Sequence, residues 1–168
     1  PCVFHHRTRD LVALTWVDDV YADGDGPDFD WFMDLMRERW DCKDLDVLGP
    51  EAPIDFVGSK VTEDADCTYI NSGVYVEKLL TEYGEVDSRE ATSPLLHDPS
   101  AEGDQSPADA NEAQSVRKWV GGIGWLVVTT RPDLAYSHCR LSQMLSSPTH
   151  GTIRGIREVM KYLRRSGC

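Results

Sequence analysis

The chain has 168 residues, of which 40% are hydrophobic and 27% are charged, and its net charge is −12. These proportions are typical of an ordinary globular protein, and no apolar run approaches the ~20 residues of a membrane-spanning helix. Taken alone, the acidic balance argues against a nucleic-acid-binding protein, because Lys and Arg make the contacts to phosphates. The basic residues are unevenly distributed, however: residues 151–168 hold five of them and a single acid, Glu158.

The cysteines indicate a reducing compartment, so we expect the chain to be intracellular. Their number is odd and none form a Cys-x-x-Cys pair, which argues against a disulfide framework or a structural zinc site. They are Cys2, Cys42, Cys67, Cys139 and Cys168. No signal peptide is visible and the chain lacks an initiator Met, so we expect it to be a piece of a longer protein.

The first predicted element is an acidic hairpin. Residues 11–17 form a short apolar, β-branched and aromatic run that is typical of a buried strand. Asp18 and Asp19 interrupt this run, and residues 20–22 resume it. The pattern predicts a β-hairpin with two acids at its bend.

The elements that follow are a second hairpin and several helices. Apolar residues at helical spacing predict a helix over residues 28–40, and a second hairpin is predicted with strands over 54–61 and 67–70. Residues 93–112 are rich in Pro, Ser, Ala, Asp and Glu and predict a loop or a poorly ordered linker. Four further helices are predicted, over about 72–83, 113–128, 133–147 and 150–165.

The Asp18-Asp19 pair has two explanations. Asp is common in solvated turns, where it hydrogen-bonds its own backbone. These acids, however, interrupt a strongly apolar strand, and two adjacent carboxylates repel each other unless a cation offsets the repulsion. Mg²⁺ takes one or two protein carboxylates and completes its shell with water and phosphate. Two-metal phosphoryl transfer also needs carboxylates on a rigid element. Asp18 and Asp19 are therefore candidate ligands for Mg²⁺ or Mn²⁺.

Motifs in the first half of the chain carry a resemblance to a known family. Trp16-Val17-Asp18-Asp19 resembles the Tyr-Val-Asp-Asp hairpin of copia-type reverse transcriptases, with Trp16 in place of Tyr. Residues 40–45 resemble that family's Phe-x-x-Lys-Asp-Leu-Gly segment. Residues 56–61, Phe-Val-Gly-Ser-Lys-Val, resemble its Phe-Leu-Gly-Ile-x-Ile primer-grip strand.

The second half of the chain extends the same resemblance. Residues 72–80 are similar to Ser-Gln-x-x-Tyr-Ile-x-x-Leu-Leu, and residues 120–126 to Val-Gly-Ser-Leu-x-Tyr-Leu. Residues 130–136, Thr-Arg-Pro-Asp-Leu-Ala-Tyr, differ from the family's Thr-Arg-Pro-Asp-Ile-Ala-Tyr at one position. The resemblance covers roughly residues 3–166 and points to the second half of a copia-type retrotransposon reverse transcriptase.

The resemblance implies an α+β fold. Residues 1–71 would be the C-terminal part of a right-hand polymerase palm, with the catalytic hairpin, a helix and the primer grip. Residues 72–168 would be a mostly helical thumb and the start of a connection. The family's third carboxylate lies upstream of Pro1 and its RNase H domain lies downstream, so the upstream fingers-and-palm half and the RNase H of the parent polyprotein are expected partners.

The function implied is RNA-directed DNA synthesis by two-metal nucleotidyl transfer, on an RNA template with a DNA primer and dNTP. Asp18 and Asp19 would be the catalytic and metal-binding residues, with Mg²⁺ or Mn²⁺ as the cofactor, and no membrane partner is expected. Primer or nucleic-acid contacts are assigned to Trp16, Phe56, Val57, Gly58, Lys60, Arg117, Lys118, Arg154, Arg157 and Lys161.

Two questions stay open, and a third is answered by the motif itself. The basic stripe of the helix over 150–165 is either a solvated face or a set of phosphate contacts. The run Gly121-Gly122-x-Gly124 lacks the Gly-Lys-Ser/Thr of a phosphate-binding loop, so close helix packing explains it better. The isolated chain, which lacks the third carboxylate, is either a polymerase fragment or an inactive truncated or domesticated remnant that binds nucleic acid or protein.

Overall fold

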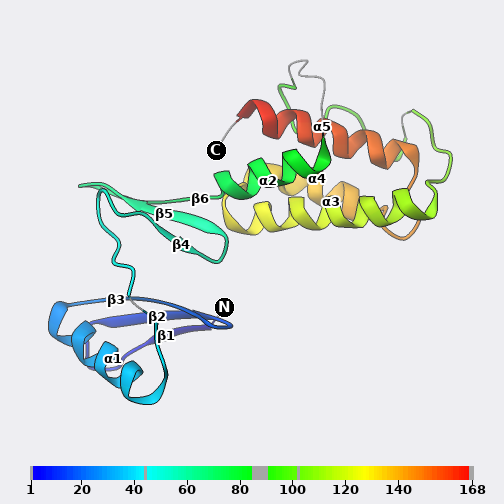
Figure 1. Ribbon diagram of the computed structural model, residues 1–168. Coiled ribbons are helices and arrows are strands. Elements are labelled where there is room, and N and C mark those ends of the chain that lie inside the picture. Colours follow the sequence, from blue (N-terminus) through cyan, green and yellow to red (C-terminus); the bar gives the residue numbers. More distant parts are fainter. Residues whose placement is uncertain (1, 44, 85–90, 102, 167–168) are drawn as a thin grey trace. The chain divides into compact units, whose positions relative to one another are not determined.

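The computed structural model describes residues 2–43, 45–84, 91–101 and 103–166. The chain divides into two compact units, Pro1–Tyr69 and Ile70–Cys168. The first unit holds most of the strands and one helix, and the second is predominantly helical, so the chain is α+β (Figure 1). The sequence predicts the corresponding boundary after residue 71.

The first sheet is antiparallel, with the strand order β1-β2-β3. Leu11 and Ala13 on β2 are buried, and because they are two residues apart they lie on the same face. The sequence predicts β2 and β3 but not β1, whose four residues are all exposed and therefore carry no burial pattern. The strands are β1 (Cys2–His5), β2 (Leu11–Trp16) and β3 (Asp19–Gly24).

Helix α1 (Gly26–Arg39) follows β3 directly. It begins two residues before the predicted start, because Pro27 occupies the first turn, where its missing N–H costs no hydrogen bond. Arg9 donates a hydrogen bond of 2.6 Å to Asp28, and its guanidinium lies 4.2 Å from the centre of the Trp31 ring. These contacts hold the turn between β1 and β2 against the first two turns of α1.

The second sheet corrects one sequence prediction. It has the order β4-β5-β6, whereas the sequence predicts one continuous strand over 54–61. Val57 and Gly58 break that strand with φ angles of 51° and 74°. Two successive positive φ angles are characteristic of a tight type I′ hairpin turn. The strands are β4 (Ile54–Phe56), β5 (Ser59–Glu63) and β6 (Thr68–Asn71).

The second unit is a bundle built around one apolar core (Figure 1). The core comprises Val76, Leu79, Val116, Val120, Ile123, Leu126, Leu134, Leu141, Ile156, Val159, Met160 and Leu163. The bundle contains α2 (Gly73–Tyr83), α3 (Ala110–Thr129), the 3₁₀ turn η1 (Pro132–Leu134), α4 (Ala135–Ser142) and α5 (His150–Ser166). Among the described helices, none is both long and apolar enough to cross a membrane.

Glycines on α3 let its neighbours approach closely. A Cβ atom on Gly122 would lie 2.8 Å from a methyl of Leu79 on α2, and one on Gly124 would lie 2.6 Å from the His138 ring on α4. A Cβ on Gly121 would meet nothing within 4 Å. The glycine run thus serves helix packing, as the sequence argument favours.

Helix α3 begins three residues before its predicted start. The Asp109 carboxylate accepts hydrogen bonds from the backbone N–H groups of Asn111 and Glu112, and the Glu112 carboxylate accepts one from the N–H of Asp109. This reciprocal capping box satisfies backbone donors at the helix start. Because both acids lie in a segment of low apolar content, apolar periodicity alone does not find this start.

Candidate functional site

The tip of the β2–β3 hairpin carries the paired acids. Trp16 pairs with Asp19 across the two strands, so Val17 and Asp18 form a two-residue turn. Val17 has a φ of 54°, while Asp18 has no positive φ. A positive φ at the first position of a two-residue hairpin turn is normally adopted by glycine. A β-branched residue in this left-handed region costs roughly 1–2 kcal/mol, and such residues cluster at functional sites.

The two carboxylates at this tip have no partner among the described residues. Asp18 and Asp19 are both exposed, and neither side chain makes a hydrogen bond or ion pair with the residues the structure describes. Among those residues, no group of three or more His, Cys, Asp or Glu side chains is arranged to hold a metal. Two adjacent, unpartnered carboxylates nevertheless fit Mg²⁺, which takes one or two protein carboxylates with water and phosphate oxygens.

Apolar side chains surround the acids. Val17 is 89% exposed and Trp16 is 36% exposed, so the tip presents apolar surface beside the carboxylates. Tyr21, two residues beyond Asp19 and therefore on the same face of β3, lies with its ring centre 5.8 Å from that of Phe56. Burial, followed by the nearby Asp23 and Glu63 carboxylates, raises the pKa of the Tyr21 hydroxyl.

The residues predicted for the primer grip are divided between a strand and a turn. Phe56 ends β4 and contacts Tyr21, so it packs against the strand that carries Asp19. Val57 and Gly58 form the tight turn, and Lys60 lies half-buried on β5 opposite Asp55. The structure thus brings Phe56 to the acidic hairpin through Tyr21.

The two basic residues predicted on α3 differ in their contacts. Lys118 lies 2.8 Å from the Glu82 carboxylate and 4.6 Å from the centre of the Trp119 ring. The hydrogen bond from Lys118, and after it the positive charge of Lys118, lower the pKa of the Glu82 carboxyl. Arg117 is exposed and pairs with none of the described residues. Of these two residues, only Arg117 presents a charge that no acid among the described residues offsets.

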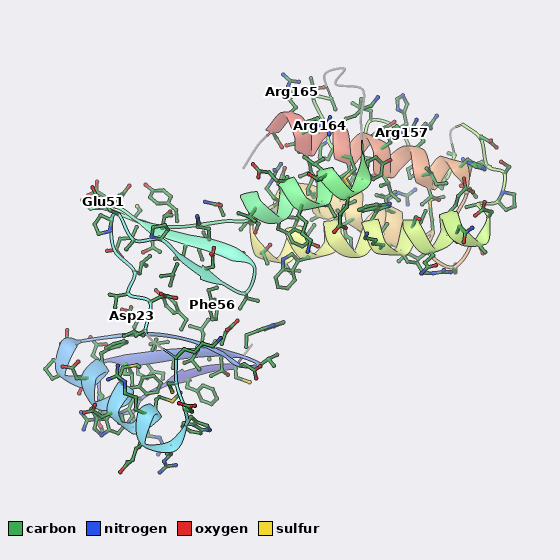
Figure 2. All side chains as sticks on the ribbon, in the orientation of Figure 1. Asp23, Glu51, Phe56, Arg157, Arg164 and Arg165 are labelled. Atoms are coloured by element: carbon green, nitrogen blue, oxygen red, sulfur yellow. The ribbon has the colours of Figure 1, made fainter. Side chains whose placement is uncertain are left out.

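Helix α5 carries the other predicted contacts, and Figure 2 shows three of its arginines, Arg157, Arg164 and Arg165. Arg157 lies beside the Tyr83 hydroxyl, where its charge opposes the rise in the pKa of Tyr83 that burial causes. Arg154 is half-buried next to Gly103. Lys161 makes no hydrogen bond or ion pair with the described residues. These side chains share one helix, but Arg154 lies against a loop and Arg157 lies against the end of α2.

A polar cluster in unit 2 was missed at the sequence level. Arg131 donates to both carboxylate oxygens of Asp133 and to the Ser166 hydroxyl, and the Tyr162 hydroxyl donates to Asp133. The hydrogen bond to Asp133 raises the pKa of Arg131, and in return Arg131 lowers the pKa of Asp133. The Arg-Pro-Asp spacing was the available signal. The cluster ties the α3–α4 connection to the end of α5.

Comparison with known proteins finds relatives among transposon polyproteins. The chain is 25% identical over 159 residues to the Retrovirus-related Pol polyprotein from transposon RE1 of Arabidopsis thaliana, covering 94% of this chain and 10% of that protein. It is 23% identical over 174 residues to the corresponding protein from transposon TNT 1-94 of Nicotiana tabacum, covering 98% and 13%. A third relative, from Arabidopsis thaliana transposon RE2, is 25% identical over 162 residues, covering 94% and 10%.

These matches cover nearly all of this chain but only a small part of each relative. No family model matches the chain, and no solved structure matches it. The chain spans about a tenth of the length of the curated relatives it matches. Nearly all of the chain aligns, and its homologues are retrovirus-related Pol polyproteins of transposons.

Proposed function

We propose that the chain is part of an RNA-directed DNA polymerase of a copia-type retrotransposon, comprising the end of the palm and the thumb. The observation that carries the proposal is the pair Asp18 and Asp19, exposed and unpartnered at a hairpin tip with a left-handed Val17. The similarity to retrovirus-related Pol polyproteins over nearly the whole chain supports it, because such a polyprotein is the expected source of this activity.

The residues at the tip have distinct roles in this proposal. Asp18 and Asp19 hold Mg²⁺, which when bound neutralises phosphate charge and activates the attacking oxygen in phosphoryl transfer. The hydrogen-bonded strands β2 and β3 keep the two carboxylates at fixed positions. Trp16 offers an aromatic surface beside the acids, against which a sugar or base at the primer end can pack.

Phe56, the last residue of β4, supports the hairpin. Phe56 contacts Tyr21, and Tyr21 shares its face of β3 with Asp19. Holding Phe56 in place therefore holds the strand that carries one of the two acids. This is a positioning role for Phe56, and Lys60 on the neighbouring strand supplies a cation for the primer backbone.

A reconstituted polymerase tests the proposal. The chain alone is expected to give no primer extension on an RNA template, and extension is expected once the upstream half of a matching polyprotein is supplied. Asp18→Asn with Asp19→Asn should then lower extension by at least about a thousandfold, since both carboxylates would hold the metal that stabilises the developing charge. Asp23→Asn, on the same face of the same hairpin, is the matched control and should keep activity.

Metal binding gives a second, independent readout. Mn²⁺ added to the unmodified chain should broaden the NMR signals of residues 17–20 selectively, and the double Asn variant should lose this effect. Full activity in the double variant, or broadening that ignores the substitutions, would contradict the assignment of Asp18 and Asp19. A chain that binds an RNA–DNA duplex yet never polymerises after reconstitution would favour the alternative, a binding module without catalysis.

A further inference from the structure

A connecting segment lies along one side of α5, next to its basic stripe. We call residues 91–101 together with Gly103 the strap. The Glu158 carboxylate accepts hydrogen bonds from the backbone N–H groups of Leu96, at 2.9 Å, and His97, at 3.4 Å. The His97 ring nitrogen Nδ1 lies 2.8 Å from the other oxygen of the same carboxylate. The one acid of α5 thus serves to hold the strap.

Two glycines on α5 provide the space for the strap. A Cβ on Gly151 would lie 2.5 Å from the Pro99 carbonyl oxygen. A Cβ on Gly155 would lie 3.3 Å from Pro99 and 3.4 Å from a methyl of Leu95. Gly151 and Gly155 are one helical turn apart, so they form a shallow groove along α5. Pro99 is fully buried in this groove.

The strap also engages the arginines around the groove. Arg165 donates to the Ala91 carbonyl oxygen at 3.4 Å, and the Arg154 guanidinium lies so close to Gly103 that a Cβ there would be 2.5 Å away. Arg140 on α4 contacts both oxygens of Asp98, at 2.8 and 2.9 Å. The strap therefore occupies basic groups at both ends of α5 and brings the Asp98 carboxylate beside this face.

We propose that the strap masks Arg154 and Arg165 on α5 and Arg140 on α4, and that a nucleic-acid backbone binds these arginines by displacing it. This inference rests on the proposed function, because it concerns how the same chain contacts its RNA–DNA duplex. The polar contacts that hold the strap are mostly exposed, and exposed ion pairs are weak and are screened by salt. A phosphate carries a full charge and accepts charge-assisted hydrogen bonds from Arg, so it competes well with a carbonyl oxygen.

Hydrogen exchange on the unmodified chain tests the displacement directly. A 20-base-pair RNA–DNA duplex is added at low salt, and exchange of the backbone amides of Leu96 and His97 is followed. These amides donate to Glu158 on α5, so displacement of the strap should make them exchange several-fold faster while the core of α3 is unchanged. Unchanged or slower exchange in the presence of saturating duplex would overturn the inference.

A strap-release variant gives a second test that leaves the net charge unaltered. Leu95→Ser with Pro99→Gly removes the two apolar contacts to the glycine groove. Duplex affinity should rise several-fold, and the slope of log affinity against log salt should steepen by about one for each phosphate that a released arginine neutralises. Leu45→Ser with Pro53→Gly, at exposed positions in unit 1, is the matched control and should leave affinity and slope unchanged.

The outcomes separate this inference from the proposed function. If the unmodified chain binds the duplex and the release variant binds with equal or lower affinity, the masking strap is wrong and the proposed function stands. If neither binds at low salt while circular dichroism shows folded helices, the proposal that this chain binds nucleic acid is wrong as well. If release tightens binding but Asp18 and Asp19 prove dispensable for polymerisation, the strap stands and the catalytic assignment falls.

Discussion

Val17 combines a β-branched side chain with a backbone conformation that Gly or Asn usually adopts. The sequence predicts a bend at Asp18-Asp19, because acids that interrupt an apolar strand are hard to accommodate elsewhere. It does not predict the left-handed φ of Val17, since Val favours extended structure and carries no turn signal. The strain becomes visible only when the register of β2 and β3 is known.

The strain at Val17 predicts an unusual stabilising substitution. Val17→Asn should raise the stability of unit 1 by up to about 1 kcal/mol, because Asn tolerates the left-handed region and Val17 is almost fully exposed, so little apolar burial is lost. Chemical denaturation of the chain measures the change. Val20→Asn, at an exposed strand position without a positive φ, is the control and should destabilise. A loss of stability in Val17→Asn would contradict the strain assignment.

Asp98 predicts a pH response of the strap. Hydrogen bonds from Ser100, with Arg140 adding to them, lower the pKa of this carboxyl from 3.8 to about 2. Because the folded-state pKa is the lower one, the carboxylate contributes stability that is present above about pH 4 and is lost as the pH falls through about 2. NMR titration should show this low midpoint, and Ser100→Ala should move it up. A midpoint near 3.8 in the unmodified chain would show that the contacts do not form.

At the scale of elements, replacing the three glycines of α3 by alanine is expected to change stability in opposite directions. Gly122→Ala and Gly124→Ala should each destabilise unit 2 by about 1–3 kcal/mol, because the added methyl would collide with Leu79 or His138. Gly121→Ala meets nothing within 4 Å and should stabilise by up to about 1 kcal/mol through helix propensity. Thermal unfolding of the three variants checks the order. Equal effects at all three positions would mean that the close approaches are absent.

Most elements were predictable where the spacing of apolar residues agreed with the positions of Gly and Pro residues that end helices and strands. The helix that becomes α2 ends where predicted, at Gly84, whose φ of 94° suits glycine. The prediction of one strand over 54–61 was wrong because Val57, a β-branched residue typical of strands, occupies a turn position. The start of α3 was missed because a capping box consists of polar residues, which apolar periodicity cannot detect.

The basic helix shows why the candidate site was only partly predictable. The sequence reveals that α5 has an apolar stripe beside a basic one, and the buried Ile156, Val159 and Leu163 fit the former. The sequence does not reveal which loops lie beside the basic stripe. The hydrogen bond between Leu96 and Glu158, for example, joins residues 62 positions apart. Contacts at that separation depend on how the chain folds back, and local patterns carry no information about it.

At the scale of the whole molecule, the buried apolar residues are unequally divided. Unit 2 holds the large core around Ile123 and Leu126, whereas the buried hydrophobic residues among the described part of unit 1 are Leu11, Ala13 and Val61. Helix α1 contributes no buried residue. A small core leaves little to offset the conformational entropy lost on folding.

This division predicts different behaviour of the two units in isolation. Residues 70–168 alone should unfold cooperatively in urea, while residues 1–69 alone should show a shallow transition or none. Circular dichroism and tryptophan fluorescence measure both, because each unit contains tryptophan, and the full chain serves as the reference. A steep, independent transition for residues 1–69 would show that unit 1 is stabilised by more than its buried side chains indicate.

The polar cluster of Arg131, Asp133, Tyr162 and Ser166 has a consequence for where unit 2 can be cut. Tyr162 and Ser166 come from the last turns of α5, so hydrogen bonds tie the end of that helix to the connection between α3 and α4. Within a longer polypeptide, cleavage before Tyr162 would remove these hydrogen bonds from the bundle. Cleavage beyond Ser166 would keep them, and only fragments of the second kind should resist further digestion.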